Sequence, residues 1–279
     1  MTKTFNYVAG VPKLQPLSTK EVNGARHYII PTGESFPSVT TVLGHFKKKS
    51  IEEWRSRVGH EEANRITNRA TTRGSKFHSM MERYLENKPI KEVLHEGVMP
   101  DQRQAFYDMR PTLDRIDNIH YIECPLYSTK MRLAGRTDVI GEFDGELSVI
   151  DFKTSTKIKP EKFIQNYFEQ TTAYSFMYEE RVGIPIDQIV IIISVDNEPD
   201  PQVFVKRKED YELNLFQKIY DYHLDKKKYS WYKYICIDEA VGRRTGLRGS
   251  TAHVHHRYTK GLSFWLIISI SASQQLRQI

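Results

Sequence analysis

Two aspartates and a lysine, Asp138, Asp151 and Lys153, lie on the two arms of a predicted β-hairpin. Asp144-Gly145 is a strong signal for a two-residue hairpin turn, and β-prone runs flank it. If these two residues form the loop, Asp138 lies directly opposite Asp151, with their Cβ atoms about 4.5–5.5 Å apart. Lys153 projects from the same face as Asp151, because side chains alternate along a strand. The spacing therefore predicts a pair of carboxylates with an ammonium group beside it.

Such a carboxylate pair is suited to holding a divalent cation. Two ionised carboxylates repel each other at this distance, and a nearby positive charge offsets the repulsion. Mg²⁺ prefers oxygen ligands and binds through one or two protein carboxylates besides water and phosphate oxygens. The alternative interpretation is a surface hairpin with a chance pair of aspartates and a solvated lysine. Apolar neighbours on both faces argue against it, since they would bury these charges without a purpose. These neighbours are Val139, Ile140, Val149, Ile150 and Phe152.

The hairpin resembles the site of PD-(D/E)XK nucleases, in which one acid precedes a strand of the form hydrophobic-acid-X-Lys. Asp138 is followed thirteen residues later by Asp151, within Ile150-Asp151-Phe152-Lys153. The first motif, Gly135-Arg136-Thr137-Asp138, lacks a proline before the acid, a departure common among the RecB-like exonucleases. The resemblance implies that Asp138, Asp151 and the carbonyl of Phe152 hold Mg²⁺ or Mn²⁺. It also implies that Lys153 orients the attacking water and offsets developing charge.

A helix is predicted over residues 50–87 from the periodicity of its apolar residues. Gly74 is expected to mark a break or a close backbone approach within it. Four basic residues fall at spacings of four, four and three, so a continuous helix would line them up where they could follow phosphates. They are Arg65, Arg69, Arg73 and Lys76. A solvated helix face is an equally good interpretation of this stripe.

His78, in the same segment, gains weight from the resemblance. A lone histidine on a helix is more often a structural or surface residue than a ligand. RecB-like and Cas4-like nucleases, however, use a helical motif of the form Gly-x-x-x-His-x-x-x-Glu-x-Tyr-Leu. The matching residues here are Gly74, His78, Glu82, Tyr84 and Leu85. The resemblance therefore implies that His78 is a metal ligand.

A second helix is predicted between Pro160 and Gly183. Gln170 and Tyr174 lie four residues apart and so face the same side. The plain interpretation is core packing of Tyr174, with Gln170 at its margin. RecB-like nucleases carry a Gln-x-x-x-Tyr motif on the helix after the catalytic strand, and Gln170-Thr-Thr-Ala-Tyr174 matches it. The resemblance implies that both residues position the substrate backbone.

Further strands are predicted at residues 121–127, 188–195 and 203–206, and a helix at 209–227. Residues 37–43 fit either a short strand or the capped start of a helix. Glu123 could reach a metal through water, stabilise Arg136 or be an exposed strand residue. This order of elements predicts an α/β protein. The resemblance, which covers about residues 25–230, implies a three-layer α/β/α restriction-endonuclease-like core with a central mixed sheet.

The 279 residues suffice for one sizeable core with a small appendage. We expect an exonuclease domain at residues 1–235, with its core at about 25–230, and an atypical tail at 236–279. The histidines of that tail, His253, His255 and His256, lack the spacing of a metal site. The net charge of +6 and the isoelectric point near 9.1 favour a polyanionic partner. Because no signal peptide, clear transit peptide or membrane-spanning run is apparent, we expect the cytoplasm of a bacterial or phage-infected cell, with no membrane partner.

The resemblance implies a Mg²⁺- or Mn²⁺-dependent exonuclease that degrades single-stranded DNA with a free end, in replication, repair or recombination. The resemblance is to the RecB-like group that includes the mitochondrial genome maintenance exonucleases and their phage relatives. Arg73 and Lys76 are expected to bind the substrate. Two alternatives remain open: a non-catalytic nucleic-acid-binding protein that retains the fold, and a structure-specific endonuclease. Two cysteines are too few for the four-cysteine iron–sulfur cluster of a Cas4-like nuclease.

Overall fold

A five-stranded mixed sheet forms the centre of the molecule. The computed structural model describes residues 3–225, and residues 1–218 form one compact unit. The strand order is β4-β5-β6-β7-β8, and every neighbouring pair is antiparallel except β6 and β7, which are parallel. The strands are β4 (Ile116–Ser128), β5 (Leu133–Phe143), β6 (Glu146–Ser155), β7 (Gln188–Val195) and β8 (Gln202–Arg207).

The predicted hairpin forms between β5 and β6, with the predicted register. Asp144 and Gly145 have φ values of 52° and 81°, the left-handed conformations that a type I′ turn requires. The paired residues run from the turn as far as Val139 and Ile150. Asp138 and Asp151 are the next residues on the two strands, beyond the last pair. The chemistry-bearing side chains therefore lie where β5 and β6 part.

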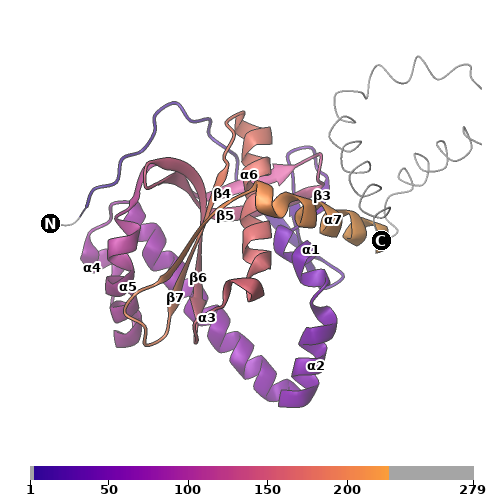
Figure 1. The fold of residues 1–279 in the computed structure, drawn as a ribbon, viewed down its shortest axis with the longest axis horizontal. Coiled ribbons are helices and arrows are strands. Elements are labelled where there is room, and N and C mark those ends of the chain that lie inside the picture. Colours follow the sequence, from indigo (N-terminus) through magenta and orange to yellow (C-terminus); the bar gives the residue numbers. More distant parts are fainter. Residues whose placement is uncertain (1–2, 226–279) are drawn as a thin grey trace, which may run out of the picture. The chain divides into compact units, whose positions relative to one another are not determined.

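Helices cover both faces of the sheet, which confirms the predicted three-layer α/β/α architecture (Figure 1). One face contacts α3 (His60–Leu85), α4 (Ile90–Val93) and α5 (Pro100–Leu113) through a buried cluster that includes Phe77, Phe106 and Phe152. The other face contacts α6 (Gln165–Val182), which crosses between β6 and β7 after a short 3₁₀ turn, η1 (Glu161–Phe163). The sheet is apolar on both sides because both are covered.

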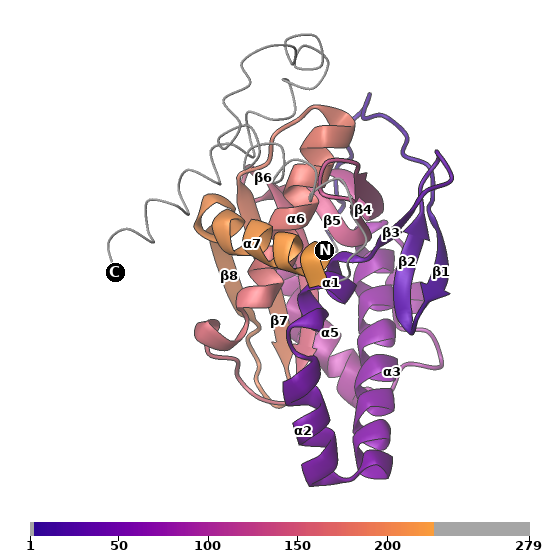
Figure 2. The same cartoon turned by 90° about the vertical axis from the view of Figure 1, so that its right-hand side faces the viewer.

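The N-terminal residues add a small antiparallel sheet, β1 (Ser18–Val22), β2 (Ala25–Ile29) and β3 (Ser35–Pro37), seen beside the main body in Figure 2. Of the two interpretations of residues 37–43, the capped start of a helix is confirmed, since β3 ends at Pro37 and helix α1 (Val39–His45) follows. Ser38 caps this helix by accepting a hydrogen bond from the Thr41 N–H at 3.0 Å. α2 (Lys48–Val58) then packs alongside the first half of α3.

The predicted interruption at Gly74 is wrong. α3 is continuous from His60 to Leu85, and a Cβ placed on Gly74 would meet no atom within 4 Å. The helix persists because its second half is held by buried residues such as Met81 and Tyr84, whose packing outweighs the cost of about 1 kcal/mol for a helical glycine.

Two boundaries also differ from expectation. The helix predicted over residues 50–87 is divided at Gly59, where α2 ends and α3 begins and φ is 93°. β4 starts at Ile116 rather than Tyr121. Its pairing with β5 shifts register between Asp117 and Tyr121, and Asn118 in this stretch has a φ of 42°. Such an irregularity breaks the alternating pattern from which a strand is predicted. The last described helix, α7 (Glu209–Asp225), runs within the predicted range. The expected domain boundary near residue 235 and the expected tail at 236–279 lie outside the described residues.

Candidate active site

The carboxylate of Asp138 lies where the backbone pairing between β5 and β6 ends. Its Oδ2 accepts a hydrogen bond of 2.7 Å from the backbone N–H of Phe152, so the side chain takes the place of the next backbone partner. Asp151, on the opposite strand, is 2 % exposed. The position of Asp151 is fixed by β7, to which β6 pairs in parallel from Ser148 to Ser155. The two acids predicted from the turn are therefore brought together by the strands themselves.

Lys153 projects from the same face of β6 as Asp151, as strand alternation predicts. Its ammonium forms an ion pair with Oδ2 of Asp151. Nζ also lies 5.2 Å from the centroid of the Tyr167 ring, which is supplied by the first turn of α6. A cation at this distance from an aromatic face is attracted by the ring. The lysine is thus held between a carboxylate and an aromatic ring, with one-fifth of its side chain exposed.

Gln170 and Tyr174 both reach this group from α6. The Nε2 atom of Gln170 donates to Oδ1 of Asp151 at 3.1 Å and lies 3.5 Å from the Tyr174 hydroxyl oxygen. Both side chains are buried, and the ring of Tyr174 lies against the backbone of Gly135 on β5. Their contacts are with the candidate site itself. Direct contact of either residue with a substrate backbone stays a prediction.

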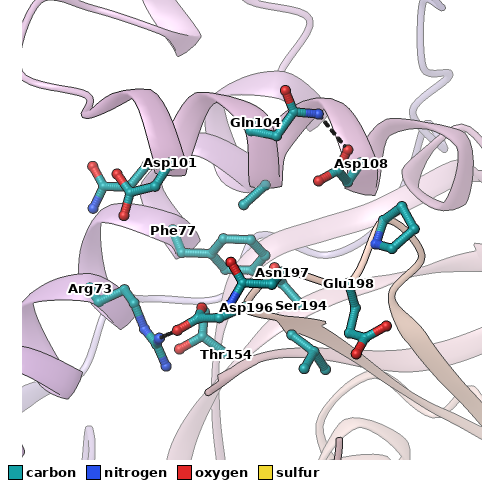
Figure 3. Close-up of a pocket in the computed structure, with 14 residues that line it drawn as sticks. Arg73, Phe77, Asp101, Gln104, Asp108, Thr154, Ser194, Asp196, Asn197 and Glu198 are labelled. Atoms are coloured by element: carbon teal, nitrogen blue, oxygen red, sulfur yellow. Dashed lines mark hydrogen bonds and ion pairs between the residues drawn. The ribbon is translucent and has the colours of Figure 1, made fainter. Parts of the chain in front are cut away.

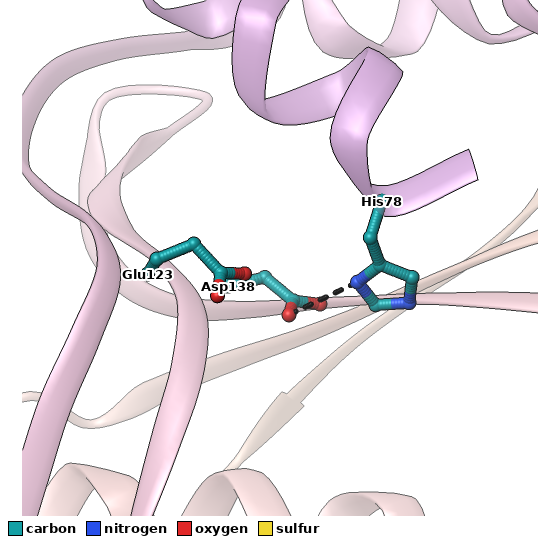
Figure 4. A group of neighbouring side chains, drawn as sticks. All are labelled: His78, Glu123 and Asp138. Carbon is teal, nitrogen blue, oxygen red and sulfur yellow. Dashed lines mark hydrogen bonds and ion pairs between the residues drawn. The ribbon is translucent and has the colours of Figure 1, made fainter. Parts of the chain in front are cut away.

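His78 reaches the site from α3, which covers the opposite face of the sheet from α6. Its Nδ1 forms a hydrogen bond of 3.1 Å with Oδ1 of Asp138. Ligand atoms of His78, Glu123 and Asp138 all lie within 4.8 Å of one another (Figure 4). A ring nitrogen and two carboxylates at this separation form a donor set suited to a divalent cation such as Mn²⁺. Asp151, which the resemblance also implies as a ligand, lies outside this group of three, and its oxygens contact Lys153 and Gln170.

Glu123 enters the site through an unusual backbone conformation. It lies in β4 with a φ of 53°, a left-handed value that is uncommon for a residue other than glycine or asparagine. Its carboxylate forms an ion pair of 2.5 Å with Arg136, one of the three possibilities considered for it, and also approaches Asp138. Because strained backbone concentrates at functional sites, this conformation adds to the case for the cluster.

The ionisation of the two acids differs with their surroundings. Burial raises the pKa of Asp151 to about 6, and the charge of Asp138 adds to the rise while Lys153 opposes it. Burial also acts to raise the pKa of Asp138, but the charge and hydrogen bond of His78, together with Lys153, outweigh it and lower the pKa. The pKa of His78 is raised, because the charge of Asp138 overcomes the effect of burial. The group therefore retains a proton on Asp151 or His78 near pH 6 and releases it at higher pH.

Arg73 and Lys76, the expected substrate-binding residues, contact other groups than the candidate metal ligands. Arg73 forms an ion pair of 2.6 Å with Asp196, in a cleft of about 460 Å³ between α3, α5 and the ends of β6 and β7 (Figure 3). The cleft also carries Asp101, Asp108 and Glu198, so carboxylates outnumber its one arginine. Lys76 donates to the Gly97 carbonyl at 3.4 Å. Such an acidic cleft disfavours phosphate, so substrate binding by Arg73 and Lys76 stays a prediction.

The sequence alone did not indicate a role for Tyr167, and it left three possible roles for Glu123. Tyr167 shares the stripe of Gln170 and Tyr174 on α6, so its spacing from Gln170 was the available signal. Glu123 precedes Cys124 and Pro125 in a strand, and nothing in that local sequence indicates a positive φ.

Comparison with known proteins identifies the class. Residues 102–229 match the model of the PD-(D/E)XK nuclease superfamily, a range that includes both aspartates, Lys153, Gln170 and Tyr174. This part of the chain is therefore similar to the nucleases of that superfamily.

Two individual proteins extend this similarity. Human mitochondrial genome maintenance exonuclease 1 is 28 % identical over 149 residues, which are 50 % of this chain and 42 % of that protein. The mouse protein of the same name is 28 % identical over 151 residues, which are 50 % of this chain and 43 % of its own length. The matched region thus spans less than half the length of these relatives. Within residues 3–225, no helix is both long and apolar enough to cross a membrane.

Proposed function

We propose that the protein is a divalent-metal-dependent DNA exonuclease that degrades single strands from a free end, in replication, repair or recombination. The observation that carries the proposal is the convergence of Asp138, Asp151, His78 and Lys153 at the point where β5 and β6 part. The names of the two relatives describe exonucleases, which supports the same reaction class. We also propose that the protein acts in the cytoplasm of a bacterial or phage-infected cell.

The residues present fit a hard divalent cation such as Mg²⁺ or Mn²⁺. Asp138 and Asp151 supply carboxylate oxygens, the Phe152 carbonyl supplies a further oxygen, and His78 supplies a ring nitrogen that suits Mn²⁺ better than Mg²⁺. When bound, the cation supplies positive charge to the scissile phosphate and to the attacking water. The two neighbouring carboxylates would otherwise repel each other.

Lys153 is suited to stabilise negative charge on the phosphate as the phosphodiester bond breaks. Its ammonium is anchored by Asp151 and by the Tyr167 ring, so it needs little reorganisation when charge develops. Gln170 fixes the orientation of Asp151 through its hydrogen bond to Oδ1. We propose that Gln170 and Tyr174 act as positioning residues for this carboxylate.

A pair of basic helices supports a nucleic-acid substrate. Residues 47–76, in α2 and most of α3, hold nine basic and four acidic side chains, which accounts for nearly all of the net charge of +6. No residue of α2 is buried, and Arg69 of α3 is exposed. Concentrated positive charge on exposed helices is suited to phosphates of a polynucleotide. The stripe from Arg65 to Lys76 is expected to contribute unevenly, because Glu62 already pairs with Arg65 at 2.8 Å.

The decisive experiment compares DNA substrates that differ in strandedness and in ends. Linear single strands, linear duplexes and covalently closed single-stranded circles, each labelled, are incubated with Mg²⁺, with Mn²⁺ or with EDTA. We expect linear single strands to be degraded with either metal, circles to be spared and EDTA to abolish cleavage.

Each other outcome points to a specific alternative. Rapid cutting of circles would identify an endonuclease, and tight binding without cleavage would identify a non-catalytic binding protein. Undiminished cleavage in EDTA would contradict the metal site. Among the described residues, neither the lysine nor any of the implied ligands is missing, which favours the enzyme over the binding protein.

A further inference from the structure

The loop between β6 and α6, residues 156–164, presents two large apolar side chains to solvent. Phe163 is 67 % exposed and Ile158 is 56 % exposed. No other large hydrophobic side chain in residues 3–225 is as exposed as Phe163. Water-exposed aromatic rings at a surface position are common, so exposure alone assigns no function. The surroundings of this loop carry the inference.

The backbone of the loop is fixed to the sheet. Ser155 and Lys157 are joined by hydrogen bonds in both directions, from the hydroxyl to the Lys157 carbonyl and from the Lys157 N–H to the hydroxyl. Lys159 and Gln202 of the edge strand β8 are likewise joined twice, at 2.7 and 3.0 Å. Phe163 is therefore displayed from an anchored segment, and little ordering of the loop is needed when a ligand binds.

The charge of the loop is almost entirely positive. It contains Lys157, Lys159 and Lys162, and its one acid, Glu161, forms an ion pair of 2.9 Å with Lys206. The ammonium of Lys162 lies 5.1 Å from the centroid of the Phe163 ring. An exposed aromatic ring with an ammonium group beside it, in a lysine-rich loop, matches a nucleotide, which offers a flat base and a phosphate together.

The loop also lies next to the candidate active site along the chain. It begins three residues after Lys153 and ends at α6, whose first turn carries Tyr167 against the ammonium of that lysine. Phe163 precedes Tyr167 by four residues. The loop is therefore joined directly to the two elements that carry Lys153 and Tyr167.

We propose that Phe163 and the lysines of this loop form a stacking site for an unpaired base of single-stranded DNA. The ring provides the stacking face, and the lysines neutralise the adjoining phosphates. The inference rests on the proposed function and deepens it, since a stacked base must have an open face and cannot lie inside a closed duplex. A protein partner would favour apolar contact over this concentration of lysines.

The test measures binding without cleavage. A single-stranded oligonucleotide carrying 2-aminopurine is titrated with wild type, Phe163→Ala, Phe163→Tyr and Ile158→Ala in EDTA, and Kd is obtained from fluorescence. We expect Phe163→Ala to weaken binding by a factor of roughly 5–100, the range typical of one lost stacked base. Phe163→Tyr, which keeps the ring, should bind within about threefold of wild type.

Ile158→Ala is the matched control, because it removes an exposed apolar side chain from the same loop but no aromatic face. It should leave affinity within about twofold of wild type. A duplex closed by hairpins at both ends should show no difference between wild type and Phe163→Ala. Since Phe163 and Ile158 are both exposed, circular dichroism and Tm should be unchanged in Phe163→Ala and in Ile158→Ala.

Three results would overturn the stacking site: unchanged single-strand affinity in Phe163→Ala, an equal loss in Ile158→Ala, or an equal loss for the closed duplex. An equal loss in Ile158→Ala would instead indicate an apolar docking surface. These outcomes are separate from failure of the proposed function, which would appear as a wild-type protein that neither binds nor cleaves DNA.

Discussion

The ring of Tyr174 lies against Gly135 so closely that no side chain fits between them. A Cβ atom on Gly135 would stand 2.6 Å from Cε1 of Tyr174 and 2.9 Å from its hydroxyl oxygen. Tyr174 in turn neighbours Gln170, which donates to Asp151. Gly135 thus allows α6 to approach β5, and the contact links two motifs that are 39 positions apart.

Gly135→Ala should therefore damage both the fold and the site. The methyl group must displace the Tyr174 ring, which we expect to lower the free energy of unfolding by about 1–3 kcal/mol. Because Tyr174 neighbours Gln170, which donates to Asp151, displacement of the ring should also move these two side chains. We therefore expect kcat to fall by a factor of roughly 10–100. Urea unfolding and steady-state cleavage measure the two effects. Wild-type stability would contradict the close contact.

Gly74→Ala should have the opposite effect on stability. Gly74 lies inside the continuous helix α3 with open space around it, so alanine adds no clash and restricts the unfolded chain. We expect the free energy of unfolding to rise by about 0.5–1 kcal/mol and Tm by roughly 1–4 °C. A lower Tm would indicate that α3 has an interruption at this residue.

Lys153→Ala should separate turnover from binding. Removing one pre-positioned positive charge is expected to lower kcat by a factor on the order of 10²–10³. DNA affinity should change little, because one phosphate contact is a small part of the total electrostatic attraction. Lys20→Ala on the exposed strand β1 is the matched control and should retain wild-type activity. Near-wild-type cleavage by Lys153→Ala would remove the catalytic assignment.

Asp151→Asn should also abolish turnover, but through weaker binding of the cation. Raising the Mn²⁺ concentration is therefore expected to restore part of its activity, whereas the same excess should not rescue Lys153→Ala. Cleavage rates across a Mn²⁺ titration distinguish the two variants. If both variants respond equally to Mn²⁺, the separate roles of the acid and the lysine are wrong.

Cation affinity should increase with pH between about 5 and 7. The pKa of Asp151 is raised to about 6 by burial, and that of His78 is raised by Asp138, so both groups hold a proton at the lower end of this range. A cation must displace these protons, which makes binding weaker as pH falls. Below pH 6 each displaced proton changes the affinity about tenfold per pH unit.

Isothermal titration with Mn²⁺ at several pH values measures this dependence. Asp151→Asn, which has no proton to release at this position, should show a shallower pH dependence than wild type. An affinity that does not change with pH would contradict the raised pKa values.

The sequence was most informative where local rules determine the geometry. The Asp144-Gly145 turn and the two-residue period of strands suffice to bring Asp138 and Asp151 together, and no distant residue is needed. Helical spacing likewise places Gln170 and Tyr174 on one side of α6. The architecture followed from the order of such elements and from family resemblance.

Contacts between elements could not be predicted in the same way. The ion pair of Arg73 with Asp196 joins residues 123 positions apart, and only the packing of α3 against the β7–β8 connection brings them together. The hydrogen bond of Gln170 to Asp151 depends on the depth at which α6 packs on the sheet. The positive φ of Glu123 depends on the local distortion of β4, which carries no signal in the residue types.

Most residues of β6 are buried, whereas no residue of α2 is buried. Protein engineering can use this difference. β6 is hydrogen-bonded on both sides and holds Asp151, so changes along it disturb folding and chemistry together. α2 has no buried residue, so its lysines and arginines can be exchanged at a cost within about 0.5 kcal/mol each. The salt tolerance and processivity of the protein should therefore be adjustable through α2 while the catalytic machinery keeps its thermal stability.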